Sequence, residues 1–199
     1  MVLYDSPVSG NCYKVRLLLA HLGIAYERRS LDVVDRSNRP DVLGGLNPSL
    51  RVPTLVLDDG RPLGESGAIL WYFGEGTRFV PEDPYDRAQV LQWMFFEQYD
   101  LEPAIAVARF WVAYSGRAGQ FADQLPAKLT AGERVLRALE QHFAGHAYAV
   151  GDSLTLADIA LYGYTHVAEE GGFSLEPHPA VRAWLRRVAS EPGHVPIAA

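Results

Sequence analysis

The chain opens with MVLYDSPVSGNCYKVRLLLAHLG (residues 1–23), in which a short apolar run, a polar loop and an amphipathic segment follow one another. Residues 1–4 are stopped by Asp-Ser-Pro, which predicts a strand that ends in a loop. Four apolar residues then recur at the spacing of one helix face: Val15, Leu18, Leu19 and Leu22. Gly23 stands where a left-handed residue would end that helix. The opening therefore predicts a strand, a loop and a helix, with the loop at the helix N-terminus.

The residues that follow extend this beginning into a four-stranded sheet. Residues 26–34 can form a second strand, and the strand–helix–strand unit predicts a right-handed crossover. A short irregular or helical stretch begins at Arg39. Residues 54–57 and 61–63 flank an Asp-Asp-Gly turn and predict a β-hairpin, after which residues 68–73 predict a helix. The order βαβ-α-ββα is typical of a thioredoxin-like sheet.

The character of the chain changes after residue 76. Residues 77–83 predict a linker, because no strand pattern follows them and the chain becomes helical and rich in aromatic residues. We therefore predict two domains: an α/β thioredoxin-like domain over residues 1–76 and an all-α helical bundle over residues 84–199.

Local signals predict where helices of the second domain begin and bend. Asp83 is the expected N-cap of a long first helix, which has proline at its first position. Pro103 should kink that helix, because proline lacks a backbone N–H. Thr155 and Asp158 form a variant capping box that begins a later helix. The capping box positions a helix and does no chemistry.

Composition excludes several classes of function. The net charge is −6 without a run of one sign, which argues against nucleic acid as a partner. No apolar run is long enough to span a bilayer, and no signal peptide is visible, so we expect no membrane association. The single cysteine excludes an internal disulfide and a cysteine zinc site and suits the cytoplasm. His142 and His146 are four residues apart, but Gly145 lies between them, so no metal site is expected.

The loop that precedes the first helix is the first candidate site. A helix N-terminus offers free backbone N–H groups and a positive dipole end, which stabilise an anion such as a thiolate. Tyr4, Ser9 and Asn11 could donate hydrogen bonds to such a thiolate. Ser9 has the place of the exposed, reactive residue of a C-x-x-C motif, and Cys12 has the sheltered place. From this segment alone, a helix cap at Ser9 or Asn11 remains the alternative, and Cys12 is expected to be a small packed hydrophobe.

Two further segments suggest peptide recognition. A cis peptide bond at Val52-Pro53 would turn the Val52 backbone toward an extended peptide, although an ordinary trans proline at a strand start is the alternative. Glu65-Ser66 opens a helix with a hydroxyl, which suits a ligand carboxylate, while Glu65 could accept from a ligand ammonium. Here too, a plain helix cap is the alternative.

Each of these segments is a weak signal alone, but their order is specific. A Ser-Pro-x-Ser loop at residues 6–9 is followed by Asn47-Pro48, Val52-Pro53, Gly64-Glu65-Ser66 and, much later, residues 154–158. Across nearly the whole chain this order resembles the cytosolic glutathione transferase family, in the bacterial, serine-type or asparagine-assisted form.

The resemblance implies roles for the candidate residues. The cysteinyl backbone of glutathione would pair with Val52 ahead of a cis Pro53, and its γ-glutamyl end would meet Glu65 and Ser66. The residues that would activate the thiol are Ser9, which donates to the thiolate, and Asn11, which shares this role in some bacterial members. Tyr4 is the alternative, because tyrosine-type members carry their catalytic phenol at the end of the first strand. Many relatives have His or Lys shortly before the helix proline, where this chain has serine and asparagine, so the positive charge for the glycyl carboxylate would come from one of three residues: Arg36, Arg39 or Arg51.

The resemblance also implies the activity and the assembly. The expected reaction is conjugation of glutathione, as co-substrate, to a small hydrophobic electrophile held by the aromatic helix of the second domain. Glutathione-dependent reduction of disulfides or peroxides and a non-catalytic glutathione-binding scaffold remain alternatives. A homodimer and no permanently bound cofactor are expected.

Overall fold

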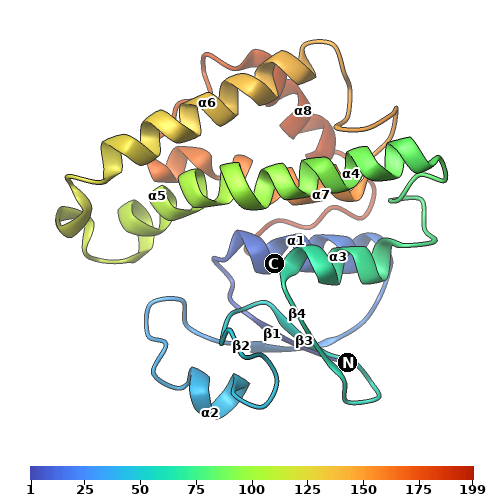
Figure 1. Cartoon of the computed structure of the whole chain (residues 1–199), viewed down its shortest axis with the longest axis vertical. Helices are drawn as coiled ribbons and strands as arrows, with labels where there is room; N and C mark the ends of the chain where they lie inside the picture. The colour runs from blue at the N-terminus through green and yellow to red at the C-terminus, as the bar shows by residue number, and fades with distance from the viewer. The chain divides into compact units, whose positions relative to one another are not determined.

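The computed structural model describes every residue of the chain, 1–199 (Figure 1). The chain separates into two compact units, one made of Met1–Thr77 together with Pro192–Ala199 and one made of Arg78–Glu191. Residues 192–199 were predicted to belong to the helical domain, whereas the structure groups them with the first unit. Phe79 and Val80, inside the predicted linker, are buried, so that segment is more than a solvated connector.

The first unit has the predicted order of elements. They are β1 (Val2–Asp5), α1 (Gly10–His21), β2 (Glu27–Ser30), α2 (Arg39–Leu43), β3 (Thr54–Val56), β4 (Pro62–Gly64) and α3 (Ser66–Gly74). The strand order is β2-β1-β3-β4; β1 runs parallel to β2 and antiparallel to β3, and β3 and β4 form the hairpin. This is the expected thioredoxin-like sheet, although β2 is shorter than predicted.

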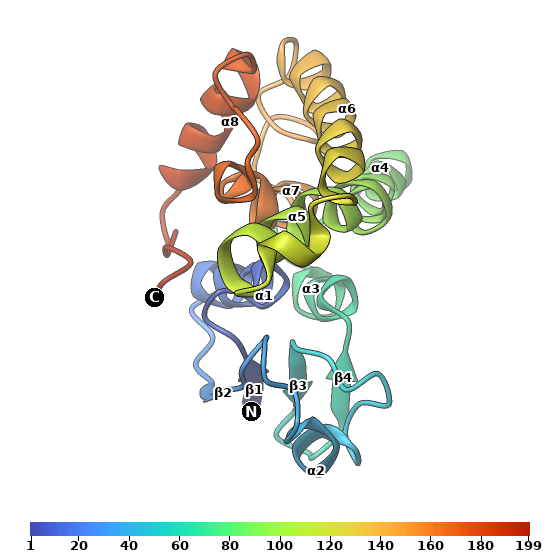
Figure 2. The ribbon, with the colours of Figure 1, turned by 90° about the vertical axis from the view of Figure 1, so that its left-hand side faces the viewer.

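One face of the sheet carries the core of this unit. Figure 2 shows α1 and α3 side by side over the strands and α2 on the other side. The core cluster joins strand residues Leu3 and Leu55 to Val15, Leu19 and Ile69 of the two helices. Since side chains alternate along a strand, the residues of β1 on either side of Leu3 face the opposite way.

The second unit is helical throughout. Its elements are α4 (Pro84–Phe96), η1 (Glu97–Ala106), α5 (Val107–Arg109), η2 (Phe110–Tyr114), η3 (Ala118–Phe121), α6 (Leu125–Phe143), α7 (Leu156–Thr165), η4 (Ala168–Gly171) and α8 (Pro179–Ala189). Pro103 lies within η1, a stretch of π-helix. Because proline has no N–H to donate to the usual acceptor, the disturbance predicted at Pro103 appears as a change of helical hydrogen bonding.

The predicted caps are present. Asp83 accepts hydrogen bonds from the backbone N–H groups of Tyr85 and Asp86 and begins α4. Thr155 and Asp158 form the capping box of α7, a helix whose residues are all buried. None of the helices is long and apolar enough to cross a membrane.

Candidate functional site

Ser9 is the N-cap of α1. Its side-chain oxygen accepts a hydrogen bond from the Cys12 backbone N–H at 3.3 Å. A serine hydroxyl combines one O–H donor with two acceptor lone pairs, so accepting this bond leaves the O–H of Ser9 free to donate. Capping and hydrogen bonding to a ligand, which the sequence presented as alternatives, are therefore compatible in one side chain.

Asn11 connects the N-termini of α1 and α3. Its side-chain oxygen accepts from Lys14 Nζ at 2.7 Å and from Ser66 Oγ at 3.3 Å. A lysine ammonium can only donate, so the oxygen of the Asn11 amide must be the atom that faces Lys14. The amide nitrogen, with two N–H donors, has no acceptor within the chain. The structure thus brings together two of the predicted site residues, Asn11 and Ser66.

The start of α3 is held in an unusual backbone conformation. Glu65 has φ 63° and ψ 119°, a positive φ that residues with a side chain rarely adopt. Such a conformation costs on the order of 1–3 kcal/mol and persists where the surrounding structure imposes it, often at ligand sites. The Glu65 side chain is exposed and makes no hydrogen bond within the chain, while Ser66 is buried.

The loop before β3 has the predicted cis peptide bond between Val52 and Pro53. The N–H and C=O groups of Val52 have no partner within the chain, because the ladder with β1 begins only at Thr54. An extended peptide ligand can pair with both groups, as a strand added to a sheet edge does.

Asn47 organises this loop, a role that the sequence analysis did not assign. Its buried amide nitrogen donates to Thr54 Oγ1 at 2.8 Å and to the Arg51 carbonyl at 3.3 Å, and its oxygen accepts from the Ser49 N–H at 3.0 Å. A Cβ atom at Gly64 would lie 2.9 Å from the Asn47 amide nitrogen. The sequence indicated this role only indirectly: Asn47 and Gly64 both belong to motifs that resemble the family, and in the structure they lie next to each other.

The three arginines considered for a glycyl carboxylate differ in their surroundings. Arg39 is buried and donates to the backbone oxygens of Leu50 at 3.0 Å and Asp32 at 2.8 Å, so it supports the loops from inside. Arg36 is exposed and donates to a nearby carbonyl. Arg51 is exposed, and its guanidinium makes no hydrogen bond within the chain. Arg39 is therefore unsuitable for the ligand, and Arg51 is the free cation.

Tyr4 lies on the other face of the sheet from α1. Its hydroxyl accepts from Arg29 Nη1 at 3.4 Å, and the two residues are register partners in β1 and β2. Leu3 and Asp5, the neighbours of Tyr4, face α1, so Tyr4 points to the other side of the sheet. This orientation favours Ser9 over Tyr4 as the donor to a thiolate.

Cys12 is expected to be inert. It is buried, and this burial, with a smaller contribution from the charge of Asp5, raises the pKa of its thiol to about 12. Iodoacetamide should leave the native protein unlabelled and label the unfolded chain fully, because the neutral, inaccessible thiol is no nucleophile. Cys12→Ala should keep kcat/KM within about twofold, since its backbone N–H to Ser9 is retained.

The Cys12 thiol also has a defined effect on stability. Its folded pKa lies above the ordinary value of 9.0, so its contribution to stability is present below pH 9.0 and is lost as pH rises toward about 12. Rapid alkylation of the native protein, or a large loss of activity in Cys12→Ala, would contradict the prediction that Cys12 is inert.

Comparisons with known proteins agree with this fold and geometry. The family model described as the glutathione S-transferase N-terminal domain matches residues 8–75, and that of the C-terminal domain matches residues 104–192. A glutathione S-transferase structure from Pseudomonas fluorescens is 42% identical, with a TM-score of 0.96 over 100% of this chain and 98% of that one. Another from Xanthobacter autotrophicus is 41% identical, with a TM-score of 0.94 over 98% of this chain and 96% of that one. Glutathione S-transferase D7 of Anopheles gambiae is 33% identical over 96% of this chain and 86% of its own length.

These matches, with the thioredoxin-like sheet and the cis-proline loop, define a glutathione-binding transferase. The chain belongs to the glutathione S-transferase family.

Proposed function

We propose that this protein stabilises the thiolate of glutathione with Ser9 and Asn11 and conjugates it to small apolar electrophiles. The observation that supports this proposal is the hydrogen bonding of these two side chains at the N-terminus of α1. The Ser9 hydroxyl already accepts one bond and keeps its O–H, and the Asn11 oxygen is occupied and leaves its N–H groups free. Both side chains therefore have donors to offer, which suits an anion.

Ser9, Asn11 and the N-terminus of α1 can together supply enough stabilisation to lower the pKa of the glutathione thiol. Lowering a thiol pKa from about 8.5 by about 2 requires roughly 2.7 kcal/mol of thiolate stabilisation. A hydrogen bond to a charged group contributes about 1.5–3 kcal/mol, and a helix N-terminus about 0.3–1 kcal/mol. Two donors and the end of α1 together reach the required value.

The remaining predicted residues would hold the rest of glutathione. The free N–H and C=O groups of Val52, ahead of cis Pro53, pair with the cysteinyl backbone. Glu65 accepts from the γ-glutamyl ammonium, and the backbone N–H groups at the N-terminus of α3, beginning with that of Ser66, bind the γ-glutamyl carboxylate. Arg51 supplies the charge for the glycyl carboxylate. Glutathione is then a co-substrate, no resident cofactor is needed, and the free thiol at Cys12 suits the cytoplasm.

The test is a comparison of products. Wild-type protein is incubated with glutathione and either 1-chloro-2,4-dinitrobenzene or hydroxyethyl disulfide, and thioether formation and disulfide reduction are each measured against the uncatalysed rate. Conjugation well above reduction supports the proposal. Reduction without conjugation would replace it by a glutathione-dependent reductase. Saturable glutathione binding with neither reaction would replace it by a non-catalytic binder.

The assembly is proposed to be a homodimer. Three large aromatic residues of α4 and η1 are exposed: Tyr85 by 71%, Phe95 by 69% and Tyr99 by 83%. We take these three aromatic side chains as the candidate interface, because a symmetric dimer would bury each of them on both copies.

Phe95→Glu is expected to produce monomers. A charge at the centre of a symmetric interface is buried twice, and an unpaired buried charge costs several kcal/mol. Size-exclusion chromatography with light scattering should show the mass falling to the 22.0 kDa of one chain. Gln141→Glu adds the same charge at an exposed position of α6 and should leave the dimer intact. A dimeric Phe95→Glu variant would disprove this interface.

A further inference from the structure

We propose that Arg16 is a positioning residue for the loop of residues 6–9, which carries Ser9, and that the segment Pro192–Ala199 holds Arg16 in place. Residues 192–199 then help to position Ser9. This inference rests on the proposed role of Ser9 in glutathione activation. It concerns residues of the first unit alone, to which both Arg16 and the segment belong.

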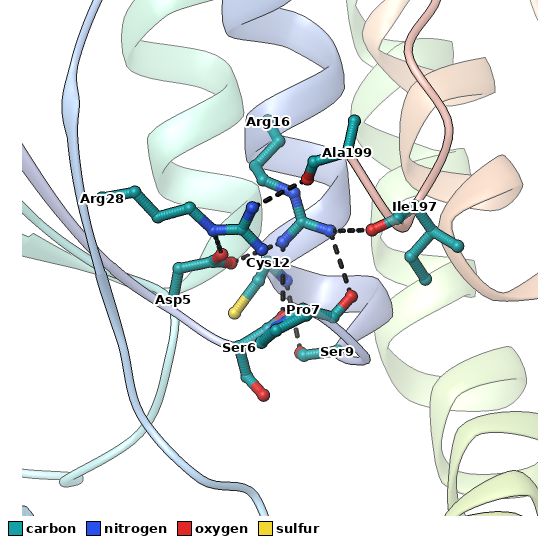
Figure 3. Close-up of polar contacts among 9 residues, drawn as sticks. All are labelled: Asp5, Ser6, Pro7, Ser9, Cys12, Arg16, Arg28, Ile197 and Ala199. Carbon is teal, nitrogen blue, oxygen red and sulfur yellow. Dashed lines mark hydrogen bonds and ion pairs between the residues drawn. The ribbon is translucent and has the colours of Figure 1, made fainter.

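Arg16 is buried and forms hydrogen bonds with three separate segments (Figure 3). Its Nη1 donates to Asp5 Oδ1 at 2.6 Å and to the Ser6 carbonyl at 3.3 Å. Its Nη2 donates to the Pro7 carbonyl at 3.2 Å and to the Ile197 backbone oxygen at 2.6 Å. A single guanidinium therefore joins the end of β1, the loop that follows it and the end of the chain.

The loop that Arg16 holds contains the proposed catalytic serine. The Ser6 carbonyl, one acceptor for Arg16, also accepts the backbone N–H of Ser9 at 3.1 Å, which closes the turn between these residues. The Pro7 carbonyl, the other loop acceptor, lies inside the same turn. The Ser9 hydroxyl lies at the N-terminus of α1. Its position thus depends on a turn whose carbonyl oxygens accept hydrogen bonds from Arg16.

Asp5 and Arg28 complete the charged cluster. Asp5 is fully buried and pairs with Arg16 and, through its other oxygen, with Arg28 Nε. Arg28 Nη1 in turn donates to the backbone oxygen of Ala199 at 2.7 Å. Two cations share one carboxylate, so backbone oxygens near the chain end provide further acceptors. A buried charged donor left without an acceptor is costly, so the Ile197 oxygen stabilises the buried Arg16 guanidinium, whereas Arg28 is partly exposed and gains less from the Ala199 oxygen.

The same segment is attached to α1 at two further points. The Tyr13 hydroxyl donates to the Val195 carbonyl at 2.7 Å, and His21 Nδ1 lies 2.9 Å from the Pro192 carbonyl. In these contacts the segment contributes backbone oxygens, and the side chains come from the body of the unit; a side-chain contact, between His194 Nε2 and the Tyr13 hydroxyl at 3.4 Å, is also present. Removing residues 196–199 should therefore matter, whereas changing the Ile197 side chain should matter little.

The test combines a truncation with a substitution. Deletion of residues 196–199 removes the backbone oxygens of Ile197 and Ala199 and keeps the contacts of Tyr13 and His21. Arg16→Lys keeps a positive charge for Asp5, but an ammonium cannot reproduce the planar fork that bridges loop and chain end. Ile197→Ala, in the full-length chain, keeps the backbone oxygen and is the matched control.

The readouts are the pKa of enzyme-bound glutathione, from its ultraviolet thiolate absorbance, and kcat with KM. Arg16→Lys and the deletion should each raise the pKa of bound glutathione and lower kcat about tenfold. The KM for glutathione should change less than about twofold, because a displaced Ser9 hydroxyl affects the stability of the thiolate more than the binding of glutathione. Ile197→Ala should match wild type. The double variant should lose no more than either single one, since both act through the same contact.

The failures of the two proposals are distinguishable. If wild type itself binds glutathione with an unshifted thiol pKa, the proposed function fails. If wild type lowers the pKa and Arg16→Lys and the truncation leave it unchanged, the inference about Arg16 is wrong. Additive losses in the double variant would show that the segment acts by another route, and a lower Tm with an unchanged pKa would reduce its role to stability.

Discussion

Asp158→Ala is expected to lower the free energy of unfolding by about 3–5 kcal/mol, the upper range for a single substitution that breaks a buried hydrogen-bond network. The Asp158 carboxylate is fully buried in the second unit and accepts four hydrogen bonds. One oxygen accepts from the Ala149 N–H at 2.8 Å and from Trp184 Nε1 at 2.9 Å. The other accepts from the N–H and the hydroxyl of Thr155, both at 3.0 Å.

The size of this effect follows from what alanine leaves behind. All four donors lie in the core, where a donor without an acceptor costs about 1–3 kcal/mol. The network also joins the start of α7 to Trp184 of α8, so the packing of two helices depends on it. Urea unfolding followed by circular dichroism gives the change in free energy directly.

Two variants sharpen this experiment. Asp158→Asn keeps the shape but turns an NH₂ group toward two of the donors, so we expect a loss smaller than that of alanine but still above about 1 kcal/mol. Asp152→Ala removes a nearby exposed acid and should change stability by less than about 0.5 kcal/mol. A loss below about 1 kcal/mol for Asp158→Ala would show that the network contributes little.

Ser9→Ala is expected to lower kcat/KM for conjugation about 100-fold and to raise the pKa of bound glutathione toward its free value of about 8.5. The hydroxyl is the donor that the thiolate loses, and the donors of Asn11 and α1 remain. The same substitution removes the acceptor of the Cys12 N–H, which should cost about 1 kcal/mol of stability. Kinetics across pH measure the first effect, and thermal unfolding measures the second.

The two roles of Ser9 can be separated by choice of side chain. Ser9→Thr keeps donor and acceptor and should retain most activity and stability. Ser9→Asp keeps an acceptor for the cap but has no proton to donate, so stability should be retained and activity lost. Activity in Ser9→Asp close to wild type would contradict thiolate stabilisation by Ser9, and Tyr4→Phe would then be the next variant to measure.

Much of the fold was readable because its signals are local. The capping box at Thr155 and Asp158, the cap at Asp83 and the left-handed Gly23 at the end of α1 each depend on a few neighbouring residues. Hydrophobic spacing likewise predicted α1, and two of the spaced residues, Val15 and Leu19, contact the sheet. The predicted βαβ-α-ββα order was confirmed for the same reason, since each element carries its own periodicity and its own turn.

The composition of the candidate site was partly readable. Ser9, Asn11, Val52-Pro53 and Glu65-Ser66 were identified by their order along the chain, and the cis bond was found where it was expected. Their roles as ligands of glutathione remain predictions. The sequence could not indicate that capping leaves the Ser9 O–H free, since that requires the direction of the hydrogen bond from Cys12.

Other features depend on contacts between distant residues. Arg39 looked like a candidate for the ligand but is buried between loop carbonyls, and Asn47 proved to be the residue that supports the cis-proline loop. Whether a polar side chain faces a ligand or the interior depends on how the loops close around it, which no short window of sequence contains.

The amino-acid sequence alone specified the order of the elements in the first unit, the caps at Asp83 and Thr155 and the family to which the chain belongs, because these are recorded in residue types and short spacings. The folded chain was needed to show that Pro192–Ala199 belongs with the first unit and meets Arg16, Arg28 and Tyr13 there. The physical reason is that this segment is held through its backbone oxygens. Every residue has such an oxygen, so the contacts with Arg16 and Arg28 leave no mark on the side chains of Ile197 and Ala199.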